Sequence, residues 1–320
     1  MPLNVVLHTD DPAPALALAR QRHPDVTFTG CDSYAALADT ITRVRAKVVY
    51  SVRFAGTRGY PREAVLESDT VDWVSVGGSG TDHLARWDTA RVTVTNAAGV
   101  AADMMAEYTL GALLHFNLDL PGFRAAQSER RWIAGHVTPI EGQTLLIVGL
   151  GQTGQAIARK AKGLGMRTIG VRARPDETPY VDAVHPTIAL EGLLPEADAV
   201  AVCVPLLDST RGLLGTGQIA AMKPGAVLVD VSRGGVVDQA ALAVALARGA
   251  LKGAALDVFE TEPLADSSPF WNMDNVIVTP HCSSVYDGWT LKSVDLFCDN
   301  LKRYRAGEVL QNQVDPVRGY

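Results

Sequence analysis

The chain has 320 residues, which is long enough for two domains that each bury a hydrophobic core. Hydrophobic residues make up 47% of it and charged residues 20%, a composition that excludes an intrinsically disordered protein. The formal net charge of −6 argues against nucleic acid or an anionic membrane as the main partner.

The N-terminal sequence and the cysteines indicate a cytoplasmic protein. The opening MPLNVVLHTDDPAPALALARQ lacks the basic leader of a signal peptide, and no apolar stretch is long enough to cross a bilayer. The cysteines show neither C-x-x-C nor metal-ligand spacing, so we expect reduced thiols and no metal site. They are Cys31, Cys203, Cys282 and Cys298.

Short apolar segments alternate with helical patterns in the first part of the chain. Strands are expected at residues 3–7, 46–51, 71–76 and 92–95, and a helix at residues 14–20. This alternation predicts a small doubly wound α/β unit.

Two segments lead from this unit to the next strand. Residues 103–118 are apolar almost throughout and predict a buried helix, placed between domains, between subunits or in an ordinary core. Residues 121–139 are polar and predict a surface segment. Its Trp132 has two interpretations: the side chain reaches into a neighbouring subunit's site, or it anchors a subunit interface.

A glycine-rich sequence in the middle of the chain has the clearest functional pattern. Residues 145–148 form a short apolar run, typical of a strand buried on both faces, and GLGQTG at residues 149–154 satisfies G-x-G-x-x-G. A helical pattern at residues 155–164 and a second apolar run at residues 168–171 complete a strand–helix–strand unit.

Each glycine of this loop has its own predicted role. Gly149 permits a tight turn, Gly151 lets the backbone approach a pyrophosphate, and Gly154 lets the helix pack closely on the strand. Together with Gln152 and Thr153, these residues are predicted to bind a dinucleotide at the helix N-terminus. The alternative is a structural turn that binds no ligand.

The end of the second strand indicates which dinucleotide is bound. NAD-binding folds place an acidic residue there, about 20 residues beyond the glycines. This chain has Arg172 and Arg174 instead, and guanidinium groups pair with a 2′-phosphate. The sequence therefore favours NADP(H) and leaves NAD(H) possible, with two solvated loop arginines as the alternative.

Later strands end in polar or ionisable residues. Strands are expected at residues 199–204, 227–231, 253–258 and 276–279, and a helix at residues 239–248. Arg233, Glu262 and His281 come after three of these strands, at the sheet edge where parallel α/β proteins bind ligands.

These three side chains suit the reduction of a 2-keto acid beside a nicotinamide. An arginine holds a carboxylate with two hydrogen bonds, and a histidine exchanges a proton near neutral pH. Taken singly, each residue also has a structural interpretation. Arg233 caps backbone carbonyls, Glu262 is a solvated turn residue, and His281 is a surface or core histidine whose hydrogen bonds are satisfied.

Longer motifs support this hypothesis. They are residues 144–154, VDVSRGGVVD at 229–238, ALDVFETEPL at 255–264, VTPH at 278–281, VGGSGTDHL at 76–84 and residues 96–110. In this combination, over nearly the whole chain, they resemble the D-isomer-specific 2-hydroxyacid dehydrogenase family.

The resemblance implies an α/β fold of two doubly wound parallel-sheet domains. The larger, residues 98–283, would be a Rossmann dinucleotide-binding domain inserted into a smaller substrate domain, residues 1–97 plus 284–320. Family members are typically homodimers with the active cleft between the domains.

The resemblance also implies roles for the three ionisable residues. Arg233 would bind the carboxylate and carbonyl of the substrate. His281 would protonate the new hydroxyl, and Glu262 would pair with it.

Further roles follow from the same motifs. Asp257 would meet the nicotinamide carboxamide, and Pro205 and Ser232 would line the cofactor. The backbone around Ser79 and Gly80 would hold the substrate carboxylate.

Substrate choice is less well determined by the sequence. Arg172 stands where NAD-dependent members carry an aspartate, so the chain most resembles the NADPH-dependent glyoxylate/hydroxypyruvate reductases, which make D-2-hydroxy acids. Arg53 either faces the substrate or is a solvated loop residue, and the small side chains of residues 77–80 leave room for a different acid. A second hypothesis is an NAD(P)-binding regulatory or corepressor-like protein without significant turnover.

Overall fold

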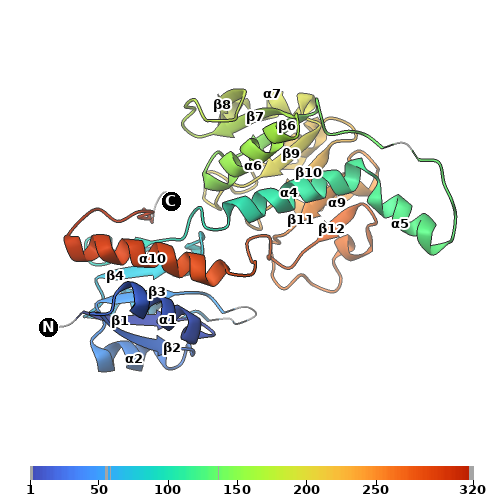
Figure 1. Ribbon diagram of the computed structural model, residues 1–320. Helices are drawn as coiled ribbons and strands as arrows, with labels where there is room; N and C mark the ends of the chain where they lie inside the picture. Colours follow the sequence, from blue (N-terminus) through green and yellow to red (C-terminus); the bar gives the residue numbers. More distant parts are fainter. Residues whose placement is uncertain (1–2, 55–56, 58, 136, 317–320) are drawn as a thin grey trace. The chain divides into compact units, whose positions relative to one another are not determined.

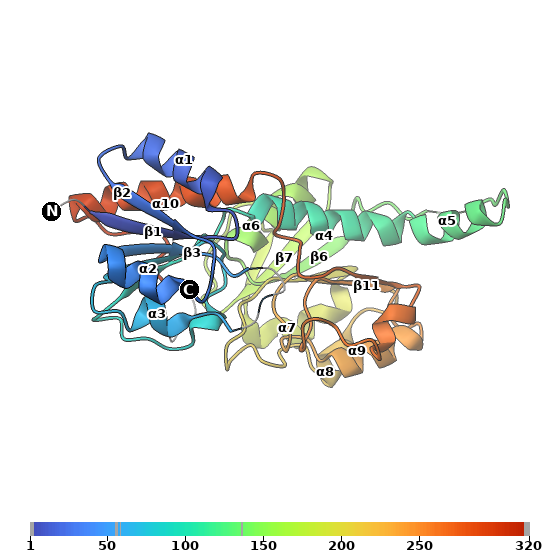
Figure 2. The same cartoon turned by 90° about the horizontal axis from the view of Figure 1, so that it is seen from below.

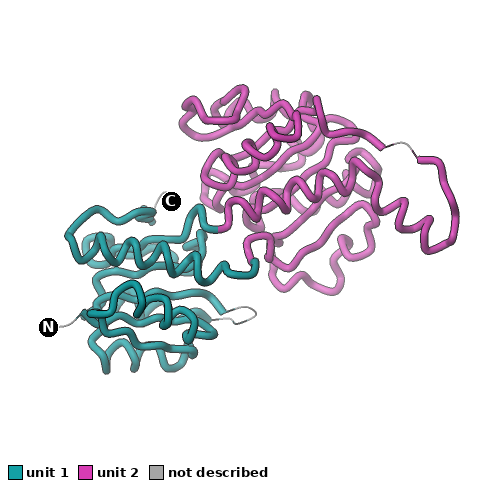
Figure 3. Tube along the Cα trace, viewed as in Figure 1, with its two compact units in different colours: residues 1–100, 286–320 teal, residues 101–285 magenta. Residues whose placement is uncertain are grey.

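The computed structural model describes residues 3–54, 57, 59–135 and 137–316. The chain divides into two compact units: unit 1 comprises residues 1–100 and 286–320, and unit 2 comprises residues 101–285 (Figure 3). Each contains one parallel sheet, and unit 2 is inserted between the two segments of unit 1. The predicted fold class is confirmed, while the predicted domain boundaries, which include residues outside the described ranges, stay predictions.

Unit 1 is built on a five-stranded sheet in the order β2-β1-β3-β4-β5, with every pairing parallel. Its strands are β1 (Asn4–His8), β2 (Thr27–Cys31), β3 (Val48–Ser51), β4 (Trp73–Val76) and β5 (Thr93–Thr95). Its helices are α1 (Pro12–Arg22), α2 (Leu37–Val44), α3 (Arg62–Leu66) and α10 (Trp289–Ala306), with a 3₁₀ turn η1 (Asp82–Leu84).

Helices cover both faces of this sheet (Figures 1 and 2). Successive side chains of a strand point to opposite faces, so Val5 packs with α1 and α10 whereas Val6 packs with α2 and α3. On the α10 side, the rings of Trp73 and Phe297 stack with centroids 5.3 Å apart. The last helix of the chain therefore completes the core that the first strands begin.

Unit 2 is built on a seven-stranded parallel sheet in the order β12-β11-β10-β9-β6-β7-β8. Its strands are β6 (Thr144–Val148), β7 (Arg167–Arg172), β8 (Ala183–Pro186), β9 (Ala199–Val202), β10 (Val227–Asp230), β11 (Gly253–Leu256) and β12 (Val276–Val278). From β6 the strands β7 and β8 extend the sheet in one direction. The chain then crosses back, and β9 pairs with β6 on its other side. Such a switch point leaves a crevice at the carboxyl ends of the strands.

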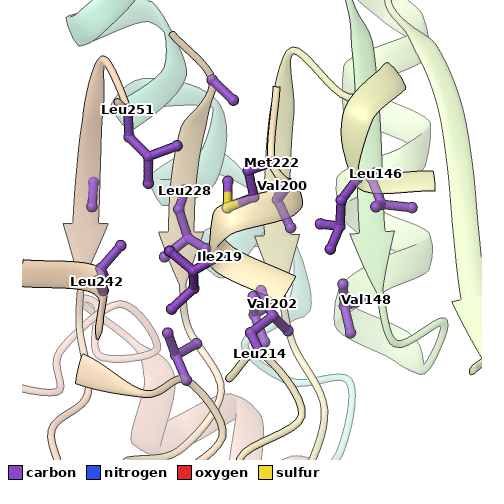
Figure 4. Packing of buried hydrophobic residues seen from close by; sticks show 14 of the residues in the cluster. Leu146, Val148, Val200, Val202, Leu214, Ile219, Met222, Leu228, Leu242 and Leu251 are labelled. Carbon is purple, nitrogen blue, oxygen red and sulfur yellow. The ribbon is translucent and has the colours of Figure 1, made fainter. Parts of the chain in front are cut away.

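Helices also cover both faces of the second sheet. They are α4 (Ala102–Asn117), α5 (Leu120–Ser128), α6 (Gln152–Gly163), α7 (Leu190–Leu193), α8 (Thr216–Ala221) and α9 (Gln239–Ala247), with 3₁₀ turns η2 (Thr187–Ala189), η3 (Leu194–Glu196) and η4 (Pro269–Asn272). α4 and α6 pack on one face, while α7, α8 and α9 pack on the other. Figure 4 shows this second layer, where Ile219 of α8 lies beside Leu228 of the sheet and Leu242 of α9 belongs to the same cluster.

The helix predicted at residues 103–118 is α4. Ala106 and Leu113 are fully buried against α6 and the sheet, and Glu107 is exposed. It is thus a core helix of unit 2. Beyond it, α5 occupies the start of the predicted surface segment and extends past the sheet of unit 2 (Figures 1 and 2); position 136 of that segment lies outside the described residues.

Several elements lack an apolar signal and were not predicted. β2 reads TFTGC and β8 reads AVHP, and both are edge strands. An edge strand has one neighbour and needs fewer apolar residues. Among the described residues, no helix has both the length and the apolar content needed to cross a membrane.

Candidate active site

The glycine-rich loop lies at the carboxyl end of β6 and the start of α6, beside the switch point of the unit 2 sheet. β6 is buried along its whole length, and Gly149 has a φ of +104°, which side-chain-bearing residues rarely adopt. A Cβ on Gly154 would collide with the carbonyl oxygen of Gly149. Glycine is therefore required at both positions for α6 to start where it does.

The loop has the features needed to hold a pyrophosphate. A Cβ on Gly151 would have no atom within 4 Å, so the backbone there faces open space. Gln152 and Thr153 are the first residues of α6, whose N-terminal N–H groups lack helical partners and carry a partial positive charge. The site thus fits a dinucleotide, the group that the sequence motif implies.

Arg172 is the last residue of β7, and Arg174 follows it on the surface. Arg172 is half-buried and Arg174 is exposed. Within the described part of the chain neither forms an ion pair. At this edge of the sheet both guanidinium groups are available to an anionic ligand.

The ends of β9 and β10 carry the next predicted residues. Pro205 is exposed beyond β9. Ser232 is buried, and both its backbone N–H and its hydroxyl donate to Oδ1 of Asp230. Arg233 donates from Nη1 to the carbonyl oxygen of Ser232 at 2.7 Å. This turn presents Arg233 at the carboxyl edge of the sheet.

Asp230 is a buried carboxyl group that lies outside the predicted site residues. Burial raises its pKa to about 7, an effect that the hydrogen bonds from Ser232 reduce and the nearby Asp257 increases. An acid at the carboxyl end of an otherwise apolar strand was the available sequence signal.

His281 and Glu262 form a hydrogen-bonded pair. Nδ1 of His281 lies 2.9 Å from Oε2 of Glu262, and the side chains are 33% and 38% exposed. Burial raises the pKa of Glu262, but hydrogen bonds from His281 and from the backbone of Phe259 outweigh it, so the pKa lies below its usual value. The carboxylate therefore stays ionised and orients the imidazole, leaving Nε2 for a ligand.

Asp257 directly follows β11 and is 1% exposed. Its Oδ1 accepts hydrogen bonds from the Thr279 hydroxyl at 2.6 Å and the Cys282 N–H at 2.8 Å, and Oδ2 accepts from the Ser283 N–H at 3.0 Å. These donors flank His281, so the structure brings Asp257, Glu262 and His281 together.

Arg53, Ser79 and Gly80 belong to unit 1, whereas the other predicted site residues belong to unit 2. The carbonyl oxygen of Ser79 accepts a hydrogen bond from Nδ2 of Asn96 at 2.7 Å, which fixes the loop after β4. The exposed Arg53 lines a pocket of unit 1 together with Thr57, Gly59, Tyr60, Asp82 and His83. No cluster of three or more potential metal ligands occurs among the residues that the structure describes.

Taken together, unit 2 has a dinucleotide-binding fold with a hydrogen-bonded histidine–glutamate pair at the carboxyl edge of its sheet, features typical of a nicotinamide-dependent oxidoreductase. Comparison with known proteins identifies its family. Residues 110–283 match the family model described as "D-isomer specific 2-hydroxyacid dehydrogenase, NAD binding domain". The chain belongs to the D-isomer-specific 2-hydroxyacid dehydrogenase family.

Relatives and solved structures agree with this assignment. A glyoxylate reductase of Korarchaeum cryptofilum is 35% identical over 230 residues, which are 70% of this chain and 69% of that protein. An (S)-sulfolactate dehydrogenase of Chromohalobacter salexigens is 34% identical over 296 residues, 88% of this chain and 92% of that protein. The crystal structure of a D-isomer-specific 2-hydroxyacid dehydrogenase from Xanthobacter autotrophicus Py2, in complex with NADPH and MES, has a TM-score of 0.86 and 30% identity and covers 100% of both chains.

The predicted family and enzyme class are therefore confirmed. The protein is a 2-hydroxyacid dehydrogenase, an oxidoreductase that uses a nicotinamide cofactor and acts on a small keto or hydroxy acid.

Proposed function

We propose that the protein reduces a small 2-keto acid of the glyoxylate or hydroxypyruvate type to the D-2-hydroxy acid, with NADPH preferred over NADH. The observation that carries this proposal is the His281–Glu262 pair at 2.9 Å on the carboxyl edge of a dinucleotide-binding sheet. The likeness to a glyoxylate reductase supports the choice of substrate.

The cofactor site would be formed by the glycine-rich loop and the residues around it. Gly149, Gly151 and Gly154 with the start of α6 would hold the pyrophosphate, and Arg172 and Arg174 would pair with the 2′-phosphate. Pro205, Ser232 and Asp257 would line the nicotinamide side. When bound, the reduced nicotinamide supplies the hydride.

The remaining residues bind the acid and provide the proton. Arg233, with the backbone around Ser79 and Gly80, would hold the carboxylate, and Arg53 would contact the rest of the substrate. The imidazolium of His281 donates its Nε2 proton to the carbonyl oxygen as negative charge develops there, and Arg233 stabilises that charge. Glu262 stabilises the imidazolium until the proton is transferred.

Substitution of His281 and Arg233 tests these roles. His281→Ala should lower kcat at least about 100-fold, because a general acid contributes roughly 10²- to 10⁴-fold. Arg233→Ala should lower kcat/KM by a similar factor, since it removes a charge-assisted contact to the carboxylate. His185→Ala, in strand β8, is the matched control and should keep normal turnover. Turnover near the wild-type rate in either of the first two variants, at unchanged melting temperature, contradicts the proposal.

We also propose that the protein is a homodimer, with the division into substrate and dinucleotide-binding domains given above. The segment around α5 exposes Leu120, Trp132 and Val137, with Trp132 fully exposed, and clustered exposed apolar side chains mark interaction sites. Sedimentation equilibrium should give the mass of two chains, and Trp132→Ser should lower the measured mass toward that of one chain. A monomeric wild-type protein would contradict this.

A further inference from the structure

A chain of hydrogen bonds connects helix α4 to the loop that carries His281. The hydroxyl of Tyr108 lies 2.8 Å from Oγ1 of Thr279, which lies 2.6 Å from Oδ1 of Asp257. The three residues come from α4, from the segment just after β12 and from the position just after β11, and all belong to unit 2.

The direction of this chain follows from the number of hydrogens. The Thr279 hydroxyl has one hydrogen and donates it to the carboxylate of Asp257. Its oxygen can therefore only accept from Tyr108. Burial raises the pKa of Tyr108 to about 12, so the phenol keeps its proton at every pH at which the enzyme would work. Hydrogen bonds aligned in this way polarise and strengthen one another.

The chain ends on the residue that holds the loop around His281. Besides Thr279, Asp257 accepts from the backbone N–H groups of Cys282 and Ser283 at 2.8 and 3.0 Å. The loop needs such an anchor because His281 has a φ of +54°, a left-handed conformation that is unfavourable for a residue with a side chain. Asp257 therefore holds the chain on both sides of His281, through the Thr279 hydroxyl before it and two backbone N–H groups after it. Glu262 holds the imidazole ring.

We propose that Tyr108 is a positioning residue for the proton donor: through the Thr279 hydroxyl it fixes the Asp257 carboxylate and the strained loop that presents His281. This inference rests on the proposed role of His281. It adds a residue of α4, far from His281 in sequence, to the determinants of proton transfer.

The test compares variants that remove one atom each. Tyr108→Phe removes only the phenolic oxygen and should lower kcat about threefold to tenfold, the effect expected for loss of one partly buried hydrogen bond, with less than about a twofold change in keto-acid KM. The solvent deuterium isotope effect on kcat should increase, because proton donation becomes slower relative to the other steps. Tyr304→Phe, which loses a tyrosine hydroxyl in unit 1, is the matched control and should leave both quantities unchanged.

A second set of variants separates positioning from a general loss of packing. Thr279→Val keeps the shape and removes the hydroxyl, so it should lower kcat at least as far as Tyr108→Phe, whereas Thr279→Ser keeps the hydroxyl and should retain most of the activity. The double variant Tyr108→Phe/Thr279→Val should be no slower than Thr279→Val alone, because both act through one hydrogen-bond chain. If Tyr108→Phe lowers the melting temperature, the comparison of the valine and serine variants of Thr279 decides between a positioning role and a loss of stability.

Unchanged kcat in Tyr108→Phe, additive effects in the double variant, or equal activity of the valine and serine variants would overturn the proposal. His281→Ala is measured in parallel. If His281→Ala retains turnover, the proposed function itself fails; if it loses turnover while Tyr108→Phe does not, only the positioning role of Tyr108 is contradicted.

Discussion

Glu262 is held from both sides, by His281 through Oε2 at 2.9 Å and by the backbone N–H of Phe259 through Oε1 at 3.0 Å. The second hydrogen bond restricts the rotation of the carboxylate and so favours one direction for the first. The imidazole consequently presents Nε2 on the side away from Glu262.

This arrangement predicts the effect of removing the charge while keeping the shape. Glu262→Gln should lower kcat for keto-acid reduction about 10- to 100-fold, because the amide cannot stabilise the imidazolium that donates the proton. Steady-state kinetics at constant pH measure this change in kcat. Wild-type rates in Glu262→Gln would show that Glu262 is an ordinary turn residue.

The cofactor preference is tested at the end of β7. Arg172→Ser/Arg174→Ser should weaken NADPH binding about 10- to 100-fold and change NADH binding little, since charge-assisted hydrogen bonds to the 2′-phosphate are lost. Cofactor fluorescence gives both dissociation constants. Arg167→Ser, at the other end of the same strand, is the control and should bind both cofactors normally. Equal weakening for the two cofactors would contradict a 2′-phosphate site.

Two glycines of α6 provide a matched pair. Gly154→Ala should destabilise the fold by about 1–3 kcal/mol and weaken cofactor binding, because the added Cβ collides with the carbonyl of Gly149 and displaces the start of the helix. Gly163→Ala adds the same atom where nothing lies within 4 Å, so it should be neutral or slightly stabilising. Urea unfolding and NADPH titration of both variants make the comparison. Equal effects would mean that the loop does not require glycine at position 154.

Much of the site could be predicted because its signals are local. Each signal is a short continuous segment: the buried β6 with the glycines that follow it, and the residues just after β10 and β12. A parallel sheet brings the carboxyl ends of its strands to one edge, whatever the lengths of the loops between them. The chain from Tyr108 through Thr279 to Asp257 could not be predicted, because it depends on how α4 packs against strands that are distant in sequence. β2 (TFTGC) and β8 (AVHP) could not be predicted because these two strands carry too few apolar residues to be distinguished from loops, whereas the edge strands β5 and β12 were predicted.

Stability in acid should depend on Asp198. Its carboxylate accepts hydrogen bonds from the Thr144 N–H at 2.8 Å and from Nζ of Lys223 at 2.6 Å. Burial raises its pKa, but these hydrogen bonds outweigh it, so the folded-state pKa lies below the usual value. Its contribution to stability is thus complete above about pH 4 and is lost as the pH falls through the folded-state pKa. Asp198→Asn should lower the free energy of unfolding by about 1 kcal/mol at pH 7, after allowance for solvent screening, and by progressively less below pH 4.

The control for that measurement is Asp266→Asn, an exposed aspartate, which should unfold like the wild type at every pH. A destabilisation by Asp198→Asn that is the same at pH 3 and pH 7 would show that the ionised form of Asp198 is not what stabilises the fold.

The most direct test of the function is the loss of NADPH absorbance, and separately of NADH absorbance, with a panel of 2-keto acids. The panel includes glyoxylate, hydroxypyruvate, pyruvate and bulkier branched or aromatic acids. We predict turnover of a small 2-keto acid with NADPH, weaker turnover with NADH, and a D-configured product where the product is chiral. Folded protein that oxidises neither cofactor with any acid of the panel would contradict the proposed reaction.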